Sequence, residues 1–452
     1  MTQRLPVVPA PGPLEAYVQH FDELFGSRAQ RAGVRRYLEG LLLPAERNKT
    51  LTALANTEPV HGAQHREAQR LQWFLSEARW AWEPLSRRRI EVLQQTPATA
   101  AHAGGVLAID EHGDRKWGAK TAHVGRQYLA NLGKVDNGVV SVSSLWADEA
   151  IYYPVDVEPY TPAQHFAVGR QAPGFRTKLQ LAAALVTQAV AAELPFRAVV
   201  ADSFYGEDDG FKQALQRLEV GYVLALRPAH SWWHPVGAIG SLAAAAEAAG
   251  WAGADEPGNW LAVERTFRDG HTERWWALEV ETGPYGPERV QRALVVTTDP
   301  ATLPDRASWY LVTNLPAPGS ERATASDLEP AALAEVVRLY GLRMWVEQSY
   351  KQVKHTLGWS DYQVRSDVAM RRHWELVCCA FAFCWWAYGC LPSADEPDAP
   401  PAAAGGEKKA APNLLAADVA GGAGLAGTVG AAVALLARLF PTATATRTAT
   451  PA

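Results

Sequence analysis

Three acidic residues stand in settings that suit a divalent-metal site. Asp110 ends the apolar run VLAID, and Asp202 ends a similar run, AVVAD. Glu347 lies among cations in the stretch YGLRMWVEQSYKQVKHTLGW, which runs from residue 340 to residue 359. Carboxylates at the ends of adjacent strands can converge on one point, and an acid on a packed helix can complete the cluster.

Three converging carboxylates would repel one another unless a cation lay between them. At ~4 Å and an effective dielectric near ~20, each pair costs on the order of 4 kcal/mol, and burial would raise their pKa values. A divalent cation removes the conflict, and open sites with hard oxygen ligands suit Mg²⁺ or Mn²⁺. Two such ions about 3.5–4 Å apart can activate a nucleophilic oxygen and stabilise the leaving oxygen of a phosphodiester.

The stretch around Glu347 has the periodicity of an amphipathic helix. At about 100° per residue, one side groups a single acid with cations and a tyrosine. That side consists of Tyr340, Arg343, Glu347, Lys351 and Lys354, and the apolar side consists of Leu342, Trp345, Val346 and Val353. A lone acid among cations suits a metal and phosphate site. A surface helix with solvated charges is the alternative, and the two strand-end aspartates count against it.

Length and composition describe a globular protein with a large core. The chain has 452 residues, enough for two or three domains, and 48% of them are hydrophobic and 20% charged. Its net charge is −5 and its pI about 6.2, so any DNA binding must come from local basic patches. The 17 tryptophans fit either a packed core or base-stacking surfaces.

The cysteines and the N-terminus bear on the cellular compartment. All four cysteines lie in the apolar stretch WELVCCAFAFCWWAYGC, without zinc-ligand spacing, so we expect buried free thiols. The uncharged run of 15 residues from Leu376 to Cys390 is shorter than the ~20 residues of a membrane span. We interpret it as a buried core helix and expect no membrane partner. The N-terminus lacks the plan of a signal peptide, so a cytoplasmic protein is expected.

The N-terminal part of the chain is predicted to form a short tail and a helical domain. Residues 1–13 are proline-rich, and we expect them to be disordered. Apolar positions keep helical spacing through residues 14–100, where arginines recur, for example in the run from Arg87 to Arg89. Such a block is a candidate DNA-binding domain, although solvated helix faces explain the same arginines almost as well.

Residues 101–227 change to an α/β pattern, which we assign to the first part of a catalytic core. GGVLAIDEHG, NGVVSVSSLWA and AIYYPVDV predict strands of an antiparallel meander. A helix at 176–193 precedes the strand that ends at Asp202, and FKQALQRLEV and GYVLALRP follow as a helix and a strand. The predicted order is three strands, helix, strand, helix, strand.

The remaining chain is predicted to hold an insertion, the end of the core and a tail. Residues 228–329 have short Trp-rich strands between prolines and glycines, which is typical of a β-rich insertion. Residues 330–391 supply the Glu347 helix and the buried Cys/Trp-rich helix that complete the core. Residues 392–452 are rich in Ala, Pro and Gly, so we expect a disordered low-complexity tail that could contain one short helix at 428–439.

Tyr340, Arg343, Glu347 and Lys354 have the spacing Y-(2)-R-(3)-E-(6)-K, which resembles the signature of DDE-type, cut-and-paste insertion-sequence transposases. Further stretches resemble one bacterial branch of that family: WGAKTAHVGRQYLANLGKVDNGVVSV, KLQLAAALVTQA, ADSFYGED and WVEQSYKQVKHTLGWSDYQVRS. The resemblance covers roughly residues 20–390. It implies an α/β fold with a ribonuclease-H-like mixed sheet and flanking helices. It also implies a β-rich insertion before the last catalytic helix and an N-terminal helical domain.

The resemblance also implies residue roles. The metal-binding triad would consist of Asp110, Asp202 and Glu347, holding two Mg²⁺ or Mn²⁺ ions. Arg343 and Lys354 would hold phosphates at the transposon end, and Tyr340 would support that contact. Lys351 lies on the same predicted helix face and is a further DNA-binding candidate.

The implied reaction takes place on double-stranded DNA of transposon ends and of a target. Water attacks the phosphodiester at the element's end, and the freed 3′-hydroxyl then joins target DNA, with a hairpin on the transposon end as one route. Two paired ends imply at least a homodimer in the active complex. The protein is then expected to work on the nucleoid.

The first acid departs from the family pattern. In that branch a second Asp and a Thr usually follow the first acid, whereas Glu111 and His112 follow Asp110 here. Because side chains alternate along a strand, Glu111 should point away from the metal that Asp110 binds. Asp110 is therefore the predicted ligand, and Glu111 is the alternative.

Other residues have weaker claims to contact DNA. Lys116, Arg126 and Lys134 are candidates, although solvation at a strand edge explains them equally well. A second group of candidates could stack on a flipped base, but most buried tryptophans belong to cores. That group consists of Trp275, Trp276 and Trp359.

Three other functions remain as alternatives. A related metal-dependent, structure-specific nuclease or resolvase would use the same acids without joining ends. An inactive, domesticated DNA-binding protein is disfavoured because the three acids, Arg343 and Lys354 are all present. A glycosidase with two carboxylates has no use for an acid among cations on one helix face and ranks last.

Overall fold

The computed structural model describes residues 6–43, 48–56, 62–233, 239–267, 271–280 and 291–390 of the chain. The tail predicted at 392–452 lies outside the described residues. Contacts divide the chain into two compact units, Met1–Ala100 with Lys351–Ala452, and Ala101–Tyr350. We call the first the helical unit and the second the sheet unit. The predicted domain limits, which kept residues 330–391 together, stay a prediction.

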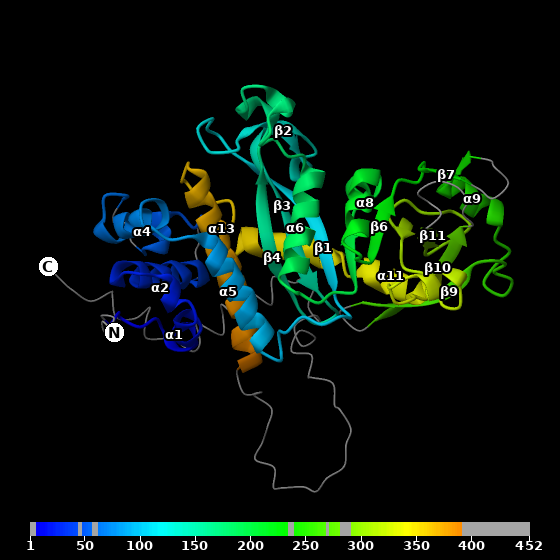
Figure 1. Ribbon diagram of the computed structural model, residues 1–452, viewed down its shortest axis with the longest axis horizontal. Coiled ribbons are helices and arrows are strands. Elements are labelled where there is room, and N and C mark those ends of the chain that lie inside the picture. The colour runs from blue at the N-terminus through cyan, green and yellow to red at the C-terminus, as the bar shows by residue number, and fades with distance from the viewer. Residues whose placement is uncertain are drawn as a thin grey trace, which may run out of the picture. The chain divides into compact units, whose positions relative to one another are not determined.

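The helical unit is built around one long helix. Its described elements are α1 (Gly12–Gln19), η1 (Asp22–Leu24), α2 (Arg28–Leu42), α3 (Leu51–Leu54), α4 (Arg66–Ser76), α5 (Trp82–Gln95) and α13 (Asp367–Cys390). The helix α13, orange in Figure 1, packs against α1, α2, α4 and α5. Its Cys378, Cys379 and Cys384 are buried and free. No helix among the described residues is long and apolar enough to cross a membrane.

Two arginines of the helical unit serve internal ion pairs. Arg35 of α2 contacts Glu15 at 2.7 Å and Asp22 at 2.6 Å. Arg89 of α5 is fully buried and pairs with Glu375 of α13 at 2.7 Å. Part of the basic character that suggested a DNA-binding domain therefore holds this unit together instead of facing a partner.

Ten strands of the sheet unit form one mixed sheet. In chain order they are β1 (Val106–Arg115), β2 (Gly125–Leu129), β3 (Lys134–Ala147), β4 (Tyr152–Tyr160), β5 (Ala198–Ala201), β6 (Tyr222–Leu226), β9 (Leu261–Thr266), β10 (Thr272–Val280), β11 (Arg292–Thr297) and β12 (Ser308–Thr313). Their order across the sheet is β2-β3-β1-β5-β6-β12-β11-β10-β9, and β4 pairs with β3. The strands β1, β5 and β6 run parallel, whereas β3 and β12 pair antiparallel with β1 and β6. This is the mixed α/β sheet that the sequence predicts.

The β-rich insertion is present and extends the same sheet. After β6, the sheet continues through β12, β11, β10 and β9. Two short strands, β7 (Ser231–Trp233) and β8 (Ile239–Ser241), form a separate pair that precedes α9 (Leu242–Ala249). All residues of β11 are buried, so this part of the sheet is covered on both faces.

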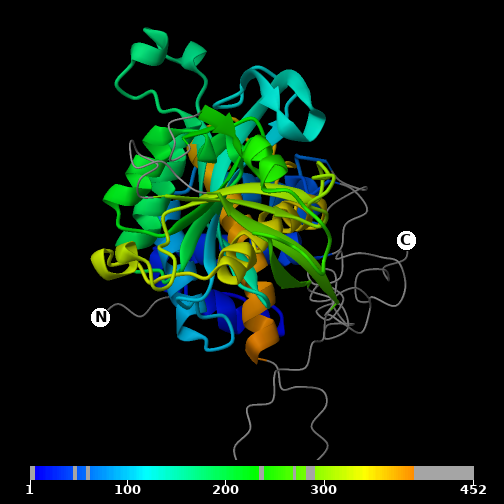
Figure 2. The ribbon, with the colours of Figure 1, turned by 90° about the vertical axis from the view of Figure 1, so that its right-hand side faces the viewer.

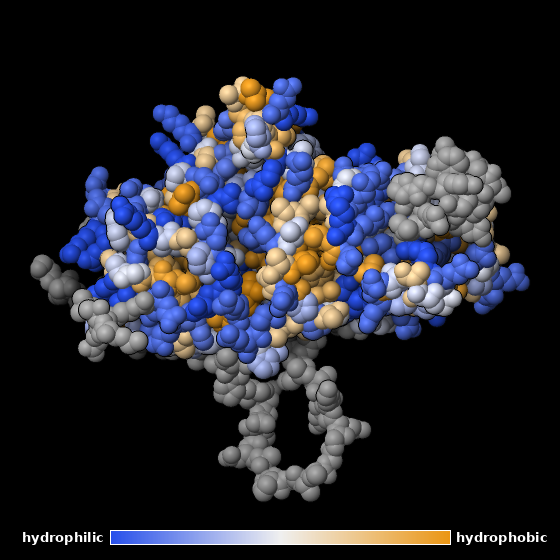
Figure 3. All heavy atoms as spheres, in the orientation of Figure 1, coloured by the Kyte–Doolittle hydropathy of each residue, from blue (hydrophilic) through white to orange (hydrophobic). Residues whose placement is uncertain are grey.

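Helices pack against the sheet. The helix α6 (Lys178–Ala191) packs against β1, β3 and β4, and α8 (Asp209–Arg217) packs against α6. In Figure 2 the green helices between residues 178 and 217 lie to one side of the strands. Apolar residues also gather on the outer face of α6 (Figure 3), where Ala183 and Ala184 are half-exposed. The other elements of the unit are η2 (Ala130–Leu132), η3 (Ala163–His165), η4 (Gly169–Gln171), α7 (Ser203–Gly206), α10 (Glu321–Ala325) and α11 (Leu333–Gly341).

The stretch around Glu347 is not one helix, contrary to the prediction. The helix α11 ends at Gly341, and the next helix, α12, runs from residue 344 as Met344–His355. In the connection, amides bond to carbonyls three residues earlier, as from Arg343 to Tyr340 at 3.0 Å. Bonds of that spacing tighten the chain, and glycine weakens a helix, so the helix breaks here. Tyr340 therefore belongs to the helix before the one that carries Glu347.

Candidate active site

Asp110 and Asp202 lie at the end of the parallel pairing between β1 and β5. The last pair in register is Ile109 with Ala201, and each aspartate is the next residue of its segment. The strand β1 itself continues to Arg115 alongside β3, so the prediction that it ends at Asp110 is wrong. The parallel ladder ends there because β5 stops and the chain turns into α7. The two carboxylates therefore start from neighbouring backbone positions.

Local backbone contacts fix both aspartates. Asp202 is the N-cap of α7, and its carboxylate accepts a hydrogen bond from the amide of Phe204 at 3.0 Å. Asp110 accepts one from the amide of Glu111 at 2.8 Å. The side chain of Asp202 is 39% exposed and that of Asp110 is 13% exposed. One acid is therefore open to solvent while the other is largely enclosed.

One arginine contacts all three acids of the predicted triad. Arg343 lies in the turn between α11 and α12, and its Nη2 donates to Asp110 Oδ2 at 3.3 Å. The same nitrogen lies 3.8 Å from Asp202 Oδ2, and Nη1 donates to Glu347 Oε1 at 3.4 Å. The side chain of Arg343 is 15% exposed, whereas that of Glu347 is 61% exposed. Acids from three separate segments thus meet around one cation.

Burial and charge shift the pKa values in this cluster. Burial raises the pKa of Asp110 to about 7, the Arg343 charge opposes that rise, and the charges of Asp202 and Glu347 add to it. Burial alone would lower the pKa of Arg343, but the negative charges around it, Asp110 first, hold it above its usual value. Burial also raises the pKa of Tyr340. One guanidinium therefore does not fully balance the acids near neutral pH, and the cluster can accept further positive charge.

The donor atoms of the cluster fit a hard divalent cation. The three side chains offer carboxylate oxygens, which Mg²⁺ and Mn²⁺ prefer. Within the described part of the chain, no three acidic, His or Cys side chains close around a single point as metal ligands do. The guanidinium of Arg343 lies between the acids instead. For the three acids to hold one metal ion together, the guanidinium of Arg343 would have to move out from between them.

Glu111 points to the opposite face of β1. Its carboxylate accepts a hydrogen bond from Lys178 Nζ of α6 at 2.8 Å, whereas Asp110 faces Arg343. Side chains alternate along a strand, so these neighbouring acids serve different faces of the sheet. The geometry favours Asp110 over Glu111 as the first acid of the cluster.

Tyr350, which the sequence reasoning missed, ties α12 to β1. Its buried hydroxyl donates to the carbonyl of Asp110 at 3.3 Å and also forms a hydrogen bond with the hydroxyl of Ser143 on β3. The ring of His112 lies 4.5 Å from that of Tyr350. Residues three apart share one side of a helix, so this contact fixes how Glu347 approaches β1. That spacing from Glu347 was the signal that could have found Tyr350.

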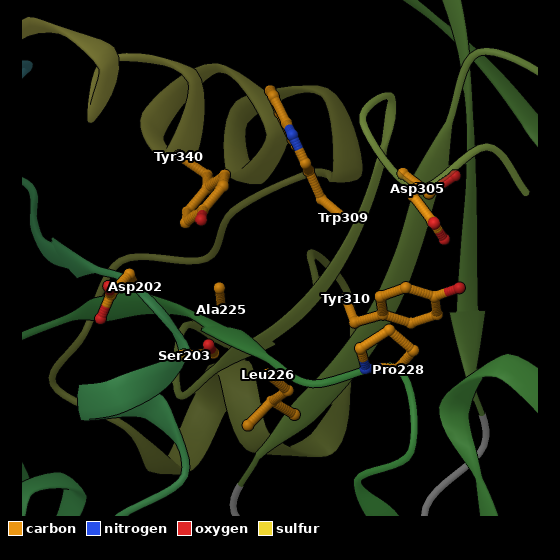
Figure 4. A pocket seen from close by; sticks show the side chains of 10 residues that line it. Asp202, Ser203, Ala225, Leu226, Pro228, Asp305, Trp309, Tyr310 and Tyr340 are labelled. Atoms are coloured by element: carbon orange, nitrogen blue, oxygen red, sulfur yellow. The ribbon is translucent and has the colours of Figure 1, made fainter. Parts of the chain in front are cut away.

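A pocket of about 220 Å³ opens beside Asp202 (Figure 4). Its lining includes Asp202, Ser203, Leu226, Trp309, Tyr310 and Tyr340. Tyr340 of α11 packs edge-on against Trp309 of β12, with 5.0 Å between ring centroids. In Figure 4, Tyr340 lies between Asp202 and Trp309. The pocket therefore has an acid at each end, Asp202 beside Tyr340 and Asp305 beside Tyr310, with aromatic side chains between them.

The tryptophans singled out in the sequence are buried. Trp275, Trp276 and Trp359 are 4%, 7% and 2% exposed. Trp275 packs against Trp309, with 4.7 Å between centroids, and Trp359 stacks on Trp374 within the helical unit at 5.2 Å. Trp309, which sequence reasoning did not single out, lines the pocket and is half-exposed.

The four candidate DNA-binding residues fall into two groups. Tyr340 and Arg343 lie beside the acids. Lys351 and Lys354 lie in the later part of α12, which belongs to the helical unit; the first is exposed and the second half-exposed. They follow Glu347 by about one and two turns, so the three residues share one side of the helix.

Comparisons with known proteins identify related chains. Residues 20–276 match the family model described as DDE superfamily endonuclease. The chain is also 31% identical over 366 residues to a probable transposase for insertion sequence element IS701 from Microchaete diplosiphon. That alignment covers 80% of this chain and 85% of the relative. The segment matched to the family contains β1 and β5, which place the first two acids of the cluster.

Proposed function

The chain belongs to the DDE superfamily of endonucleases and is an insertion-sequence transposase of that family, and we propose that it cleaves the ends of its element with two divalent metal ions and joins them to target DNA. The meeting of Asp110, Asp202 and Glu347 around Arg343 is the observation that carries this proposal. A structural ion pair needs one acid for one arginine. Three acids gathered at mutual electrostatic cost suit a site that is completed by metal ions.

The fold assigns each carboxylate a different part in the reaction. Metal ions held by the three carboxylates would supply an activated water and stabilise the leaving oxygen. Asp110 and Asp202 would be metal ligands of fixed position, since each carboxylate accepts a hydrogen bond from a backbone amide. Glu347 is 61% exposed and faces the solvent from which DNA approaches. Tyr350 keeps α12 against β1, so that Glu347 stays within reach of the two aspartates.

Arg343 changes partners in this proposal. Its guanidinium neutralises the acids before metal binds and then turns to a phosphate of the cleaved strand. The Nε atom of Arg343 is buried and has no hydrogen-bond partner among the described residues, a situation that costs about 1–3 kcal/mol. The observed position therefore leaves the side chain incompletely satisfied. Tyr340, Lys351 and Lys354 complete the group that holds the DNA.

The pocket beside Asp202 is proposed to take one unstacked base of the cleaved strand. Trp309 and Tyr340 offer aromatic surfaces there, and stacking of a base on an aromatic ring contributes about 1–3 kcal/mol. At about 220 Å³, the pocket is smaller than the ~300–1,000 Å³ typical of drug-sized ligands, so it suits a single base. Trp309 takes the role that the sequence suggested for the buried Trp275.

The proposed partners follow from the reaction. Joining two paired ends requires two catalytic clusters, so we propose a homodimer that acts on double-stranded DNA of the nucleoid, in the cytoplasm. The helical unit is the proposed DNA-binding domain. Its exposed Arg28 is a candidate contact, whereas Arg35 and Arg89 are committed to internal ion pairs.

A cleavage and joining assay tests the function and separates it from that of a resolvase. The substrate is a duplex that carries the element's end, found from the inverted repeats that flank the gene. With Mg²⁺ we expect cleavage that leaves a 3′-hydroxyl and, from pre-cut ends, joining to a second duplex. Cleavage without joining would favour a structure-specific nuclease or resolvase instead.

Single substitutions in the same assay test the triad. We expect Asp202→Asn to abolish end cleavage, because it removes a charged ligand and leaves the fold intact. Asp209→Asn is the matched control, since that side chain is 61% exposed in the same unit and belongs to the next helix. Full end cleavage by Asp202→Asn with Mg²⁺ would show that the triad assignment is wrong.

A further inference from the structure

The far end of β1 leads into a region with unusually exposed aromatic residues. This region, which we call the sheet tip, comprises residues 115–137 and includes β2 and the start of β3 (Figure 1). Trp117 is 87% exposed, and Tyr128 and Val135 are each 53% exposed. Large apolar side chains that stay this exposed contribute little to the core, so packing does not explain their presence.

The sheet tip is strongly basic in a chain of net charge −5. It contains five cations and one acid: Arg115, Lys116, Lys120, Arg126 and Lys134, with Asp136. Asp136 lies 3.2 Å from Arg115 and 3.8 Å from Lys134. Lys120 and Arg126 are exposed, and Lys134 is 63% exposed even beside Asp136. The surface therefore keeps a net positive charge after its own ion pair is counted.

The strand register divides the groups of the sheet tip between the two faces of the sheet. Arg126, Tyr128 and Val135 lie on the face that Asp110 occupies, whereas Arg115, Lys134 and Asp136 lie on the opposite face. The guanidinium of Arg115 lies 4.1 Å from the centre of the Trp117 ring, within cation–π range. A protein partner would favour an apolar centre that is depleted of charge. Here each exposed apolar side chain has cations close by in the sequence, which fits the phosphates and sugars of a nucleic acid.

We propose that the sheet tip binds the phosphates of duplex DNA about five base pairs from the scissile phosphate. This inference rests on the proposed function, since it takes Asp110 to mark the position of that phosphate. The sheet tip begins at residue 115, five residues beyond Asp110 on β1, which at ~3.4 Å per residue is about 17 Å; Arg126 carries its charge there on the face of Asp110. One strand of B-DNA advances ~3.4 Å per base pair, so the same distance spans about five base pairs.

Salt-dependent binding of the element's end tests this contact. Fluorescence anisotropy with a labelled duplex gives the affinity of wild type, Arg126→Ala/Lys134→Ala and Trp117→Ala between low and moderate salt. Each lost phosphate contact lowers the slope of log affinity against log salt by about 0.9. We therefore expect the double variant to lose about 1.8 from that slope and to bind roughly tenfold more weakly. Trp117→Ala should weaken binding with the slope unchanged, because no charge is removed.

The control removes two exposed arginines elsewhere in the sheet unit, in Arg217→Ala/Arg274→Ala. A slope for the sheet-tip double variant equal to that of this control overturns the inference. If wild type still cleaves its ends in that case, the sheet-tip inference fails alone. If wild type neither binds nor cleaves the ends, the proposed function fails with it. Thermal unfolding confirms that each variant is folded before its slope is compared.

Shortened duplexes test the distance and the source of the DNA. One duplex keeps three base pairs beyond the cleavage site on one side, and a second keeps three on the other. We expect wild type and the double variant to differ in the slope of log affinity against log salt on one of these two duplexes and to have the same slope on the other. A difference that persists on both, or that appears only in capture of target DNA, overturns the placement at five base pairs.

Discussion

Replacing Arg343 by methionine removes the cation between the three acids and keeps much of the side-chain volume. The lost contacts are those to Asp110 at 3.3 Å, to Glu347 at 3.4 Å and to Asp202 at 3.8 Å. Without the guanidinium, the acids repel one another in a partly buried setting. We expect the variant to fold less stably in EDTA and to recover when Mg²⁺ is added.

The magnitude follows from the burial of each partner. Removing one member of a buried ion pair costs about 3–5 kcal/mol. Asp110 and Arg343 are both largely enclosed, but Asp202 and Glu347 are 39% and 61% exposed, so solvent screens most of their share. We therefore expect a loss of about 3 kcal/mol. For a unit of this size, about 2–4 °C per kcal/mol gives a fall in Tm of roughly 6–12 °C.

Thermal unfolding at pH 8 measures the effect, with EDTA and then with increasing Mg²⁺. The control is Arg338→Met, because Arg338 is 38% exposed and its partner Glu149 is 60% exposed, so the loss of that pair should cost at most ~1 kcal/mol. Arg338 also donates to the carbonyl of Gly104 at 2.9 Å, and the loss of that hydrogen bond adds about 0.5–1.5 kcal/mol. We expect Mg²⁺ to raise the Tm of Arg343→Met more than that of wild type, since no arginine competes with the metal. Equal Tm values for Arg343→Met and Arg338→Met in EDTA would refute the view that Arg343 balances the cluster.

Three further predictions concern the same cluster. The folded pKa of Asp110, about 7, lies above the ordinary ~3.9, so the folded chain keeps a proton that the unfolded chain releases between these values. Denaturant titrations in EDTA should therefore show wild-type stability falling as the pH rises from ~4 to ~7, and Asp110→Asn should lack that component. Glu111→Gln should keep end cleavage within a few-fold of wild type, whereas loss of cleavage would make Glu111 the ligand. Tyr350→Phe should lower the cleavage rate about tenfold with DNA affinity unchanged, because Glu347 loses its alignment; an unchanged rate would leave Tyr350 without a positioning role.

Much of the cluster could be predicted because it depends on local patterns. The acid after each apolar run indicated where the parallel pairing of β1 and β5 ends. Asp110 and Asp202 each follow the last paired residue of their strand, although β1 itself continues beside β3 to Arg115. Alternation along a strand also predicted that Glu111 would point away from Asp110, and its bond to Lys178 shows what it faces instead. These inferences needed no knowledge of distant contacts.

The rest could not be predicted because it depends on tertiary packing. A helical wheel drawn from Tyr340 onward assumes one unbroken helix. The helix α11 instead ends at Gly341, and the turn that follows directs Arg343 toward the acids. The strand that pairs with β6 determines which tryptophan lines the pocket, and that strand is β12, which carries Trp309. Strand pairing could not be read from the sequence, so the sequence could not distinguish Trp309 from Trp275. The fully buried charge of Arg89 likewise depends on its distant partner.

The most direct test of the central claim is cleavage of the element's end by Asp202→Cys with Mg²⁺ and with Mn²⁺. A thiolate is a softer ligand than a carboxylate and discriminates against Mg²⁺ more strongly than against Mn²⁺. We predict that Asp202→Cys loses cleavage with Mg²⁺ and regains a large part of it with Mn²⁺, whereas Asp202→Ala stays inactive with both ions. Wild-type cleavage by Asp202→Cys with Mg²⁺, or equal activity of the Cys and Ala variants with Mn²⁺, would contradict a metal-binding role for Asp202.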